Sequence, residues 1–120
     1  MAASYFLEAL YNGMAQPLTN DAFLKSKITN FVDFLTACLF KRLDNARFTE
    51  FKNKIEELRA CDTGLFIVHV TESMVPFRTN VPAYVEKMLA ENNAKASELT
   101  EEEHGKLCRY ITMFIDVASQ

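Results

Sequence analysis

The segment LKSKITNFVDFLTACLFKRL, residues 24–43, decides the fold class. Its apolar side chains recur at steps of three and four residues, the spacing that places them on one face of an α-helix. This stripe comprises Leu24, Ile28, Phe31, Val32, Leu35, Cys38, Leu39 and Leu43. The opposite face carries Lys25, Thr29, Asp33 and Thr36. We therefore predict a long amphipathic helix, capped by Thr19 or Asn20, that buries one side.

Phe40 breaks the order of this helix. At about 100° per residue its side chain falls on the polar face. Two explanations stay open. Either the helix ends or bends before Phe40, or another chain or segment covers the ring.

Two weaker helical signals flank the long helix. The first runs from Ser4 to about Asn12, with Gly13 as its stop, and its stripe is formed by Leu7, Leu10 and Tyr11. The second follows Asp44 and Asn45, which can end the long helix and cap the next one. Its narrow stripe consists of Phe48, Phe51, Ile55 and Leu58. Such a narrow stripe indicates a peripheral, largely solvated helix.

Two helices near the C-terminus carry clear start signals. Asn80 can cap a helix that has Pro82 in its first turn, and Asn92 and Asn93 end it. The last helix begins with the capping box formed by Thr100 and Glu103. Its buried face is expected to hold Leu107, Tyr110, Ile111, Phe114, Ile115 and Ala118.

Residues 65–75 are ambiguous. Their β-branched content favours a strand. No other segment alternates convincingly, however, and a lone strand has no partner for its backbone groups. As a helix the segment places Phe66, Ile67, Val70 and Met74 together, and Pro76 would end it. We predict a helix after a turn at residues 61–64, with the strand as the alternative.

These segments predict an all-α protein, a compact bundle of about six helices. Its 120 residues fit a single domain, residues 1–120, with one core. Connections are short, which favours antiparallel neighbours. With only three glycines, the chain is unsuited to a loop-rich or β-rich fold.

The expected compartment follows from what the sequence lacks. The longest apolar run, Leu65 to Val70, is far below the roughly 20 residues that span a bilayer. The N-terminus has no secretory pattern, and the three cysteines form no Cys-x-x-Cys pair. We expect an intracellular protein, most naturally cytoplasmic, with reduced thiols and no membrane partner.

No residue pattern for chemistry stands out. His69 and His104 fall in different predicted helices without further ligands at metal spacing, and no glycine-rich phosphate loop occurs. Cys108 follows His104 by four residues, but a small cysteine at the edge of an apolar stripe is usually structural. His69 with Glu72 is more simply a surface contact than an acid–base pair. We therefore expect no catalytic residue, metal, cofactor or small-molecule substrate.

Charge argues against nucleic acid as a partner. The net charge is −3, and acidic residues interrupt the basic excess of residues 24–59, where eight basic and five acidic side chains give +3. Residues 60–120 carry five basic and nine acidic side chains, a balance of −4. This asymmetry is typical of solvated helix faces, and the alternative is head-to-tail association between copies.

The leading functional hypothesis is a non-enzymatic helical subunit that works by protein–protein contact, in a homo-oligomer or in a larger assembly such as a scaffold or virion. Its ten Phe and four Tyr supply more aromatic surface than such a core needs, and we expect Phe40, Phe34 and Tyr11 to face a partner. The alternative is a regulatory adaptor that binds an amphipathic partner helix in a groove between the second and fifth predicted helices. In shape alone such a bundle resembles death-fold adaptors and Bcl-2-like proteins, and shape does not determine function.

Overall fold

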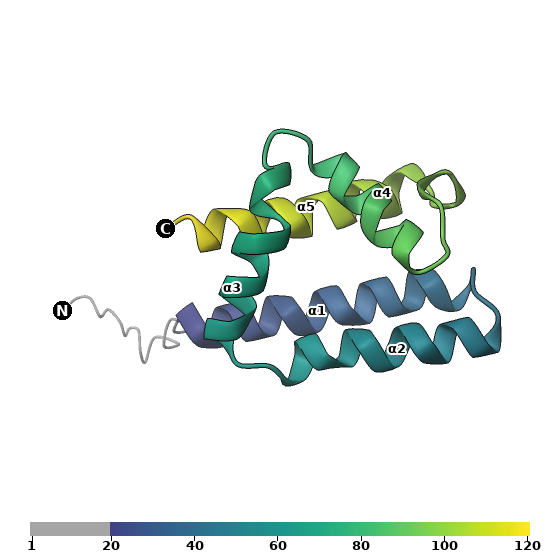
Figure 1. Cartoon of the computed structure of the whole chain (residues 1–120), viewed down its shortest axis with the longest axis horizontal. Coiled ribbons are helices and arrows are strands. Elements are labelled where there is room, and N and C mark those ends of the chain that lie inside the picture. Colours follow the sequence, from purple (N-terminus) through teal and green to yellow (C-terminus); the bar gives the residue numbers. More distant parts are fainter. Residues whose placement is uncertain (1–19) are drawn as a thin grey trace, which may run out of the picture.

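The computed structural model describes residues 20–120, which contain α-helices and two short 3₁₀ turns but no strand. The elements are α1 (Asn20–Phe40), α2 (Asn45–Ala60), α3 (Thr63–Ser73), the 3₁₀ turn η1 (Val75–Phe77), α4 (Val81–Glu91), the 3₁₀ turn η2 (Ala96–Glu98) and α5 (Glu101–Ala118) (Figure 1). The predicted all-α class is confirmed, with five α-helices in the described range. The helix expected from Ser4 to about Asn12 lies outside the described residues.

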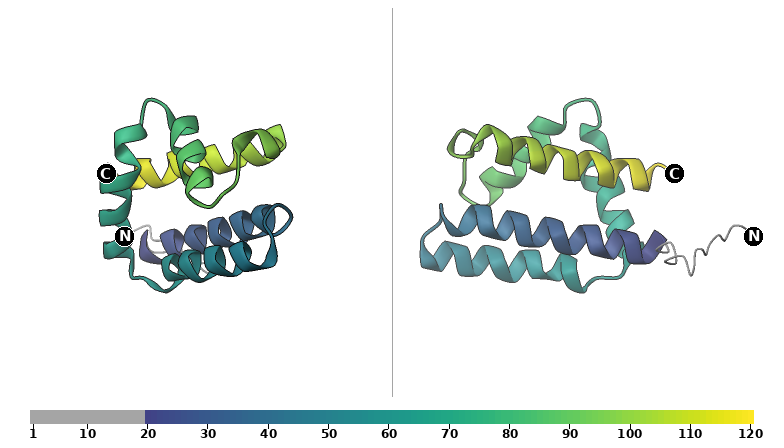
Figure 2. Two further views of the ribbon diagram at one scale, coloured as in Figure 1. Left: turned by 45° about the vertical axis from the view of Figure 1, so that its right-hand side comes forward. Right: turned by 180° about the vertical axis from the view of Figure 1, so that it is seen from behind.

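The helices form two layers joined at one end by an upright helix. α1 and α2 run antiparallel in one layer, and α4 and α5 make up the other (Figures 1 and 2). α3 crosses between the layers at the end where α1 begins and α5 ends. α1 and α3 both contact α5, whereas α2 packs chiefly on α1. The side of α2 that faces α4 is therefore left without a closely packed helix.

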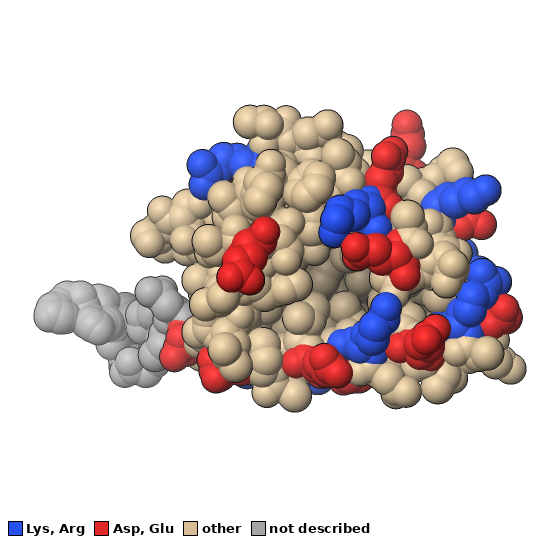
Figure 3. Space-filling model, viewed as in Figure 1, with Lys and Arg blue, Asp and Glu red and all other residues tan. Residues whose placement is uncertain are grey.

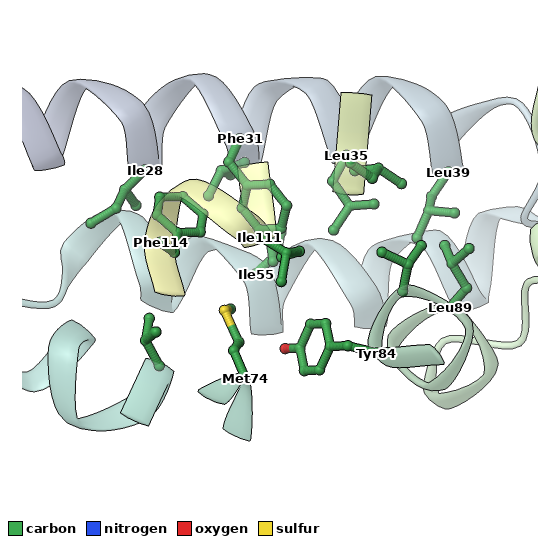
Figure 4. Packing of buried hydrophobic residues seen from close by; sticks show 14 of the residues in the cluster. Ile28, Phe31, Leu35, Leu39, Ile55, Met74, Tyr84, Leu89, Ile111 and Phe114 are labelled. Atoms are coloured by element: carbon green, nitrogen blue, oxygen red, sulfur yellow. The ribbon is translucent and has the colours of Figure 1, made fainter. Parts of the chain in front are cut away.

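The core lies between the layers and is centred on phenylalanine rings. The Phe114 ring meets Phe66 edge to face at 4.9 Å and Phe31 at 5.4 Å between centroids. All eight residues of the predicted α1 stripe are buried. Figure 4 shows the side chains of α1 pointing into a space that Met74 enters from the end of α3 and that Tyr84 and Leu89 enter from α4. The helical spacing of residues 24–43 thus identified one whole wall of the core.

Residues 65–75 are helical, so the preferred prediction is confirmed and the strand alternative is wrong. The Asp62 carboxylate caps α3 by accepting a hydrogen bond from the Leu65 N–H at 2.9 Å. Phe66 and Val70 are fully buried one turn apart. The cap and the burial on one face outweigh the β-branched composition. The predicted turn at 61–64 is shorter than expected, because α3 already begins at Thr63.

The other helix ends follow their capping residues closely. Asp44 accepts from the Arg47 N–H at 2.9 Å and caps α2. Thr100 and Glu103 form the predicted capping box of α5. After α4, Asn93 has a φ of 62°, the left-handed conformation that commonly follows a helix end. Together with the buried stripes, these caps explain why the boundaries fall where they do.

Long-range polar contacts hold neighbouring helices in register, one within a layer and one between the layers. The Lys25 ammonium donates to the carbonyl oxygens of Arg59 at 3.0 Å and Cys61 at 2.7 Å, so a cation from α1 caps the end of α2. The Arg42 guanidinium pairs with Glu103 in the first turn of α5 at 2.8 Å.

No helix of the described part is long and apolar enough to cross a membrane.

Candidate interaction surfaces

Phe40 is the most exposed large apolar residue that the structure describes. It is the last residue of α1, and 68% of its surface is open to solvent. Its ring meets the half-buried Phe48 edge to face at 5.3 Å, and Phe48 in turn lies 6.3 Å from the buried Phe51. We call the Phe40–Phe48 pair the aromatic tip. α1 includes Phe40, so the explanation that the helix ends or bends before this residue is wrong. Apart from Phe48, nothing in the described part packs on the ring, and its covering by another chain or segment stays a prediction.

The other two residues expected to face a partner have different surroundings. Phe34 is half-buried, with its ring 6.2 Å from Tyr110 and the Lys106 ammonium 4.7 Å above its centroid. It therefore takes part in the packing of α1 against α5. Phe34 and Phe40 lie six residues apart on α1 and project from different faces of it. Tyr11 lies outside the described residues.

A groove opens between α2 and α4, with α3 at one end. It encloses about 320 Å³. Its walls come from Phe31, Phe51, Lys54, Ile55, Glu57, Leu58, His69, Met74, Tyr84, Met88, Glu91 and Asn92. Figure 3 shows a hollow there, with acidic and basic side chains around its rim. The sequence predicts such a groove between the second and fifth predicted helices, which are α1 and α4. In the structure α2 forms the wall opposite α4, and α1 contributes only Phe31.

Tyr84 gives this groove a polar group. The residue is 6% exposed and its side chain lines the groove. Burial, aided by the nearby Glu91 carboxylate, raises the pKa of Tyr84 to about 12, so the hydroxyl stays protonated at neutral pH. It can therefore donate a hydrogen bond to whatever fills the groove. No sequence pattern marked this tyrosine, because its position depends on how α4 packs.

A second hollow lies where α1 begins. It encloses about 430 Å³ between the start of α1, the outer side of α3 and the end of α5. We call it the α3 hollow. Its lining is Asp21, Phe23, Leu24, Thr63, Gly64, Ile67, Val117, Ala118 and Gln120. Beside it on α3, Leu65 is 62% exposed and Val68 is 51% exposed. Apolar surface therefore gathers at both ends of α1.

The thiols and histidines form no activated pair. Cys108 Sγ lies 3.8 Å from His104 Nδ1, but burial raises the pKa of the Cys108 thiol instead of lowering it. Burial and the Glu103 carboxylate, 3.7 Å from the sulfur, raise the pKa of Cys38 to about 11. A nucleophilic cysteine needs the opposite shift. Among the described residues no group of three or more His, Cys, Asp or Glu is placed to hold a metal ion.

Comparison with known proteins gives no relative from which a role could be transferred. No protein-family model matches this chain, and no curated protein or solved structure is significantly similar to it. The features of the described residues that bear on function are the aromatic tip, the α2–α4 groove and the α3 hollow.

Proposed function

We propose that this chain is a non-enzymatic helical protein–protein interaction subunit that associates with further copies of itself. The exposure of Phe40 supports this most directly. Phenylalanine rings elsewhere on α1 are buried or half-buried apart from Phe23, which is 40% exposed, and the core is complete without Phe40. An exposed aromatic ring backed by a second ring is typical of a protein interface.

The charges around the aromatic tip favour a second copy as the partner. Lys41, Asp44 and Arg47 lie close to Phe40 and Phe48 in the sequence, with side chains 66%, 59% and 45% exposed. A two-fold contact brings the same patch of both copies together, so a self-complementary patch must carry both signs of charge. In such a contact Lys41 of one copy can approach Asp44 of the other while the two Phe40 rings meet.

The size of the tip predicts weak association. Stable interfaces bury roughly 800 Å² on each partner, which is more than two rings and their neighbours provide. We therefore expect a monomer–oligomer equilibrium that depends on concentration, unless further subunits reinforce the contact as they would in a larger assembly.

Light scattering coupled to size-exclusion chromatography tests this proposal. The wild-type mass should rise with concentration over about a hundredfold range. Phe40→Glu should remain monomeric with unchanged helicity by circular dichroism. Asn30→Glu, which adds the same charge at an exposed position of α1 remote from the tip, should associate like wild type. A wild-type chain that stays monomeric throughout, or a Phe40→Glu variant that associates normally, contradicts the proposal.

The α2–α4 groove supports a second candidate function, a regulatory adaptor that holds an amphipathic partner helix. Apolar side chains on the partner would pack against Phe51, Ile55 and Met88. One polar group on the partner would accept a hydrogen bond from the Tyr84 hydroxyl. The rims carry both signs of charge, including Lys54 on α2 and Glu91 on α4. Helix-in-groove recognition uses this combination of apolar floor and polar rim.

Panning a displayed library of amphipathic helical peptides would separate this candidate from the first. Enriched peptides should bind wild type and Ala90→Glu, whose exposed site lies on α4 outside the groove lining. They should fail to bind Met88→Glu, which places a charge in the groove. The absence of enrichment, or equal binding to Met88→Glu, would rule the adaptor out.

A further inference from the structure

We infer that the α3 hollow is the docking site of the chain's own N-terminal segment, residues 4–12, acting within the same molecule. Two independent observations lead to this assignment. One is an apolar hollow bordered by exposed side chains, and the other is the composition and attachment point of the segment that precedes α1.

The hollow is apolar where a helix would pack. Phe23, Ile67 and Val117 line it from three different helices. Gly64 adds no side chain to the α3 wall, so another chain segment can approach the backbone closely there. Val68 lies beside Gly64 on the same face of α3 and continues the apolar surface outward. In the part of the chain that the structure describes, nothing covers this surface.

The segment before α1 has a matching composition. Residues 1–19 contain one charged side chain, Glu8. The stripe predicted for residues 4–12 is formed by Leu7, Leu10 and Tyr11, and Glu8 lies outside it. The hollow likewise has one charged lining residue, Asp21, whose carboxylate already accepts a hydrogen bond from the Thr63 hydroxyl at 2.9 Å. Docking therefore buries apolar surface without leaving a charge unpaired in the contact.

Chain geometry favours this hollow over the groove. The segment joins α1 at Asn20, next to Asp21 in the rim of the hollow. Residues 13–19 are a seven-residue connection that can span at most about 25 Å. It contains Gly13 and Pro17, which suit a reversal of direction. The tether thus holds the segment beside the hollow at a high effective concentration.

Helix energetics give a reason for the segment to dock. Isolated helices shorter than roughly 12–15 residues are marginal in water, and residues 4–12 are fewer than that. The predicted stripe can be stabilised only by packing against apolar surface. The α3 hollow offers such a surface beside the attachment point, since Asp21 is among its lining residues.

A single-tryptophan reporter tests the inference, because the chain has no Trp of its own. Tyr11→Trp should be made on the full chain carrying Phe40→Glu, so that association through the aromatic tip does not affect the result. Its emission should be blue-shifted, and acrylamide should quench it less than in the same protein unfolded in urea. Adding Phe23→Glu should move both values towards those of the unfolded chain. The parent reporter protein serves as the matched control, because it already carries a Phe→Glu change, Phe40→Glu, at the opposite end of α1.

Val68→Glu provides a second disruption that leaves the fold intact, since this residue is 51% exposed. Circular dichroism should show unchanged helicity in every variant. The inference is overturned if acrylamide quenches the indole as strongly as in the unfolded chain. It is also overturned if neither Phe23→Glu nor Val68→Glu changes the emission and the quenching. A blue shift that disappears on dilution also overturns it, because the occupant would then be the segment of a second copy. None of these outcomes bears on association through Phe40.

Discussion

Arg42 and Glu103 join the end of α1 to the start of α5. Arg42 Nη2 lies 2.8 Å from Glu103 Oε1, and each side chain is only 15% exposed. The same carboxylate oxygen accepts the Thr100 N–H at 2.9 Å and thereby completes the capping box of α5. One residue thus fixes both where α5 begins and how it sits against α1.

Glu103→Gln should destabilise the protein by about 2 kcal/mol. Glutamine can keep the capping contact, but it leaves the half-buried Arg42 without its counter-charge. Urea unfolding followed by circular dichroism measures the change. Glu102→Gln, at an exposed position in the same turn, should stay within about 0.5 kcal/mol of wild type. Equal stabilities for the two variants would show that the Arg42–Glu103 contact contributes nothing.

Stability should fall in acid, partly through Glu103. The backbone hydrogen bond from Thr100, followed by the Arg42 charge, holds the pKa of this carboxyl below its usual 4.5. A pKa depressed in the folded state adds stability that is complete above 4.5 and is lost as pH falls through the folded value. Urea midpoints between neutral pH and acid should therefore drop less steeply for Glu103→Gln than for wild type. Some dependence should remain, because the pKa values of Asp44 and Glu56 are also lowered by their hydrogen bonds with arginine.

Truncation of two phenylalanines should lower the stability of the protein to very different extents. Phe114→Ala removes a fully buried ring that contacts Phe31 and Phe66, and should cost about 3–5 kcal/mol. Phe40→Ala removes a ring that is mostly in water and should cost less than about 1 kcal/mol. Chemical denaturation of both variants provides the measurement. A large loss for Phe40→Ala would mean that the ring is part of the core, which would also contradict its proposed role in assembly.

The three thiols should react at different rates. Cys38 is buried and its pKa is raised to about 11, so at neutral pH it has very little thiolate. A maleimide should therefore label Cys38 of the folded protein more slowly than the half-buried Cys61 and Cys108. All three should react together in urea, and Cys38→Ser should remove the slow phase. A fast reaction at Cys38 would show that the end of α1 opens readily.

The exposed surfaces were only partly predictable from the chain. The sequence places Phe40 on the polar face of α1, away from the apolar stripe. The side chain is 68% exposed, as expected for that face. Phe34 is half-buried against Tyr110 and Lys106 of α5, and its contact with a partner stays a prediction. Nothing in a periodic pattern tells which neighbouring helix will cover a flanking residue. The prediction for Tyr11 stays a prediction.

Local interactions determined the elements. Each of these interactions joins residues only a few positions apart, so the sequence alone is enough to predict it. They are the α1 stripe, the capping box of Thr100 and Glu103, and the cap by Asn80 before Pro82. Even the β-branched residues 65–75 could be predicted as a helix, since a lone strand would leave its backbone groups unpaired.

The tertiary structure alone decided what lies between the elements. The α2–α4 groove exists because α2 packs chiefly on α1 and leaves its other side open. The contacts of Lys25 with the end of α2, and of Arg42 with Glu103, join residues that are 34 to 61 positions apart. Such contacts depend on the angles and offsets at which whole helices pack, and these are set by the shapes of many buried side chains together.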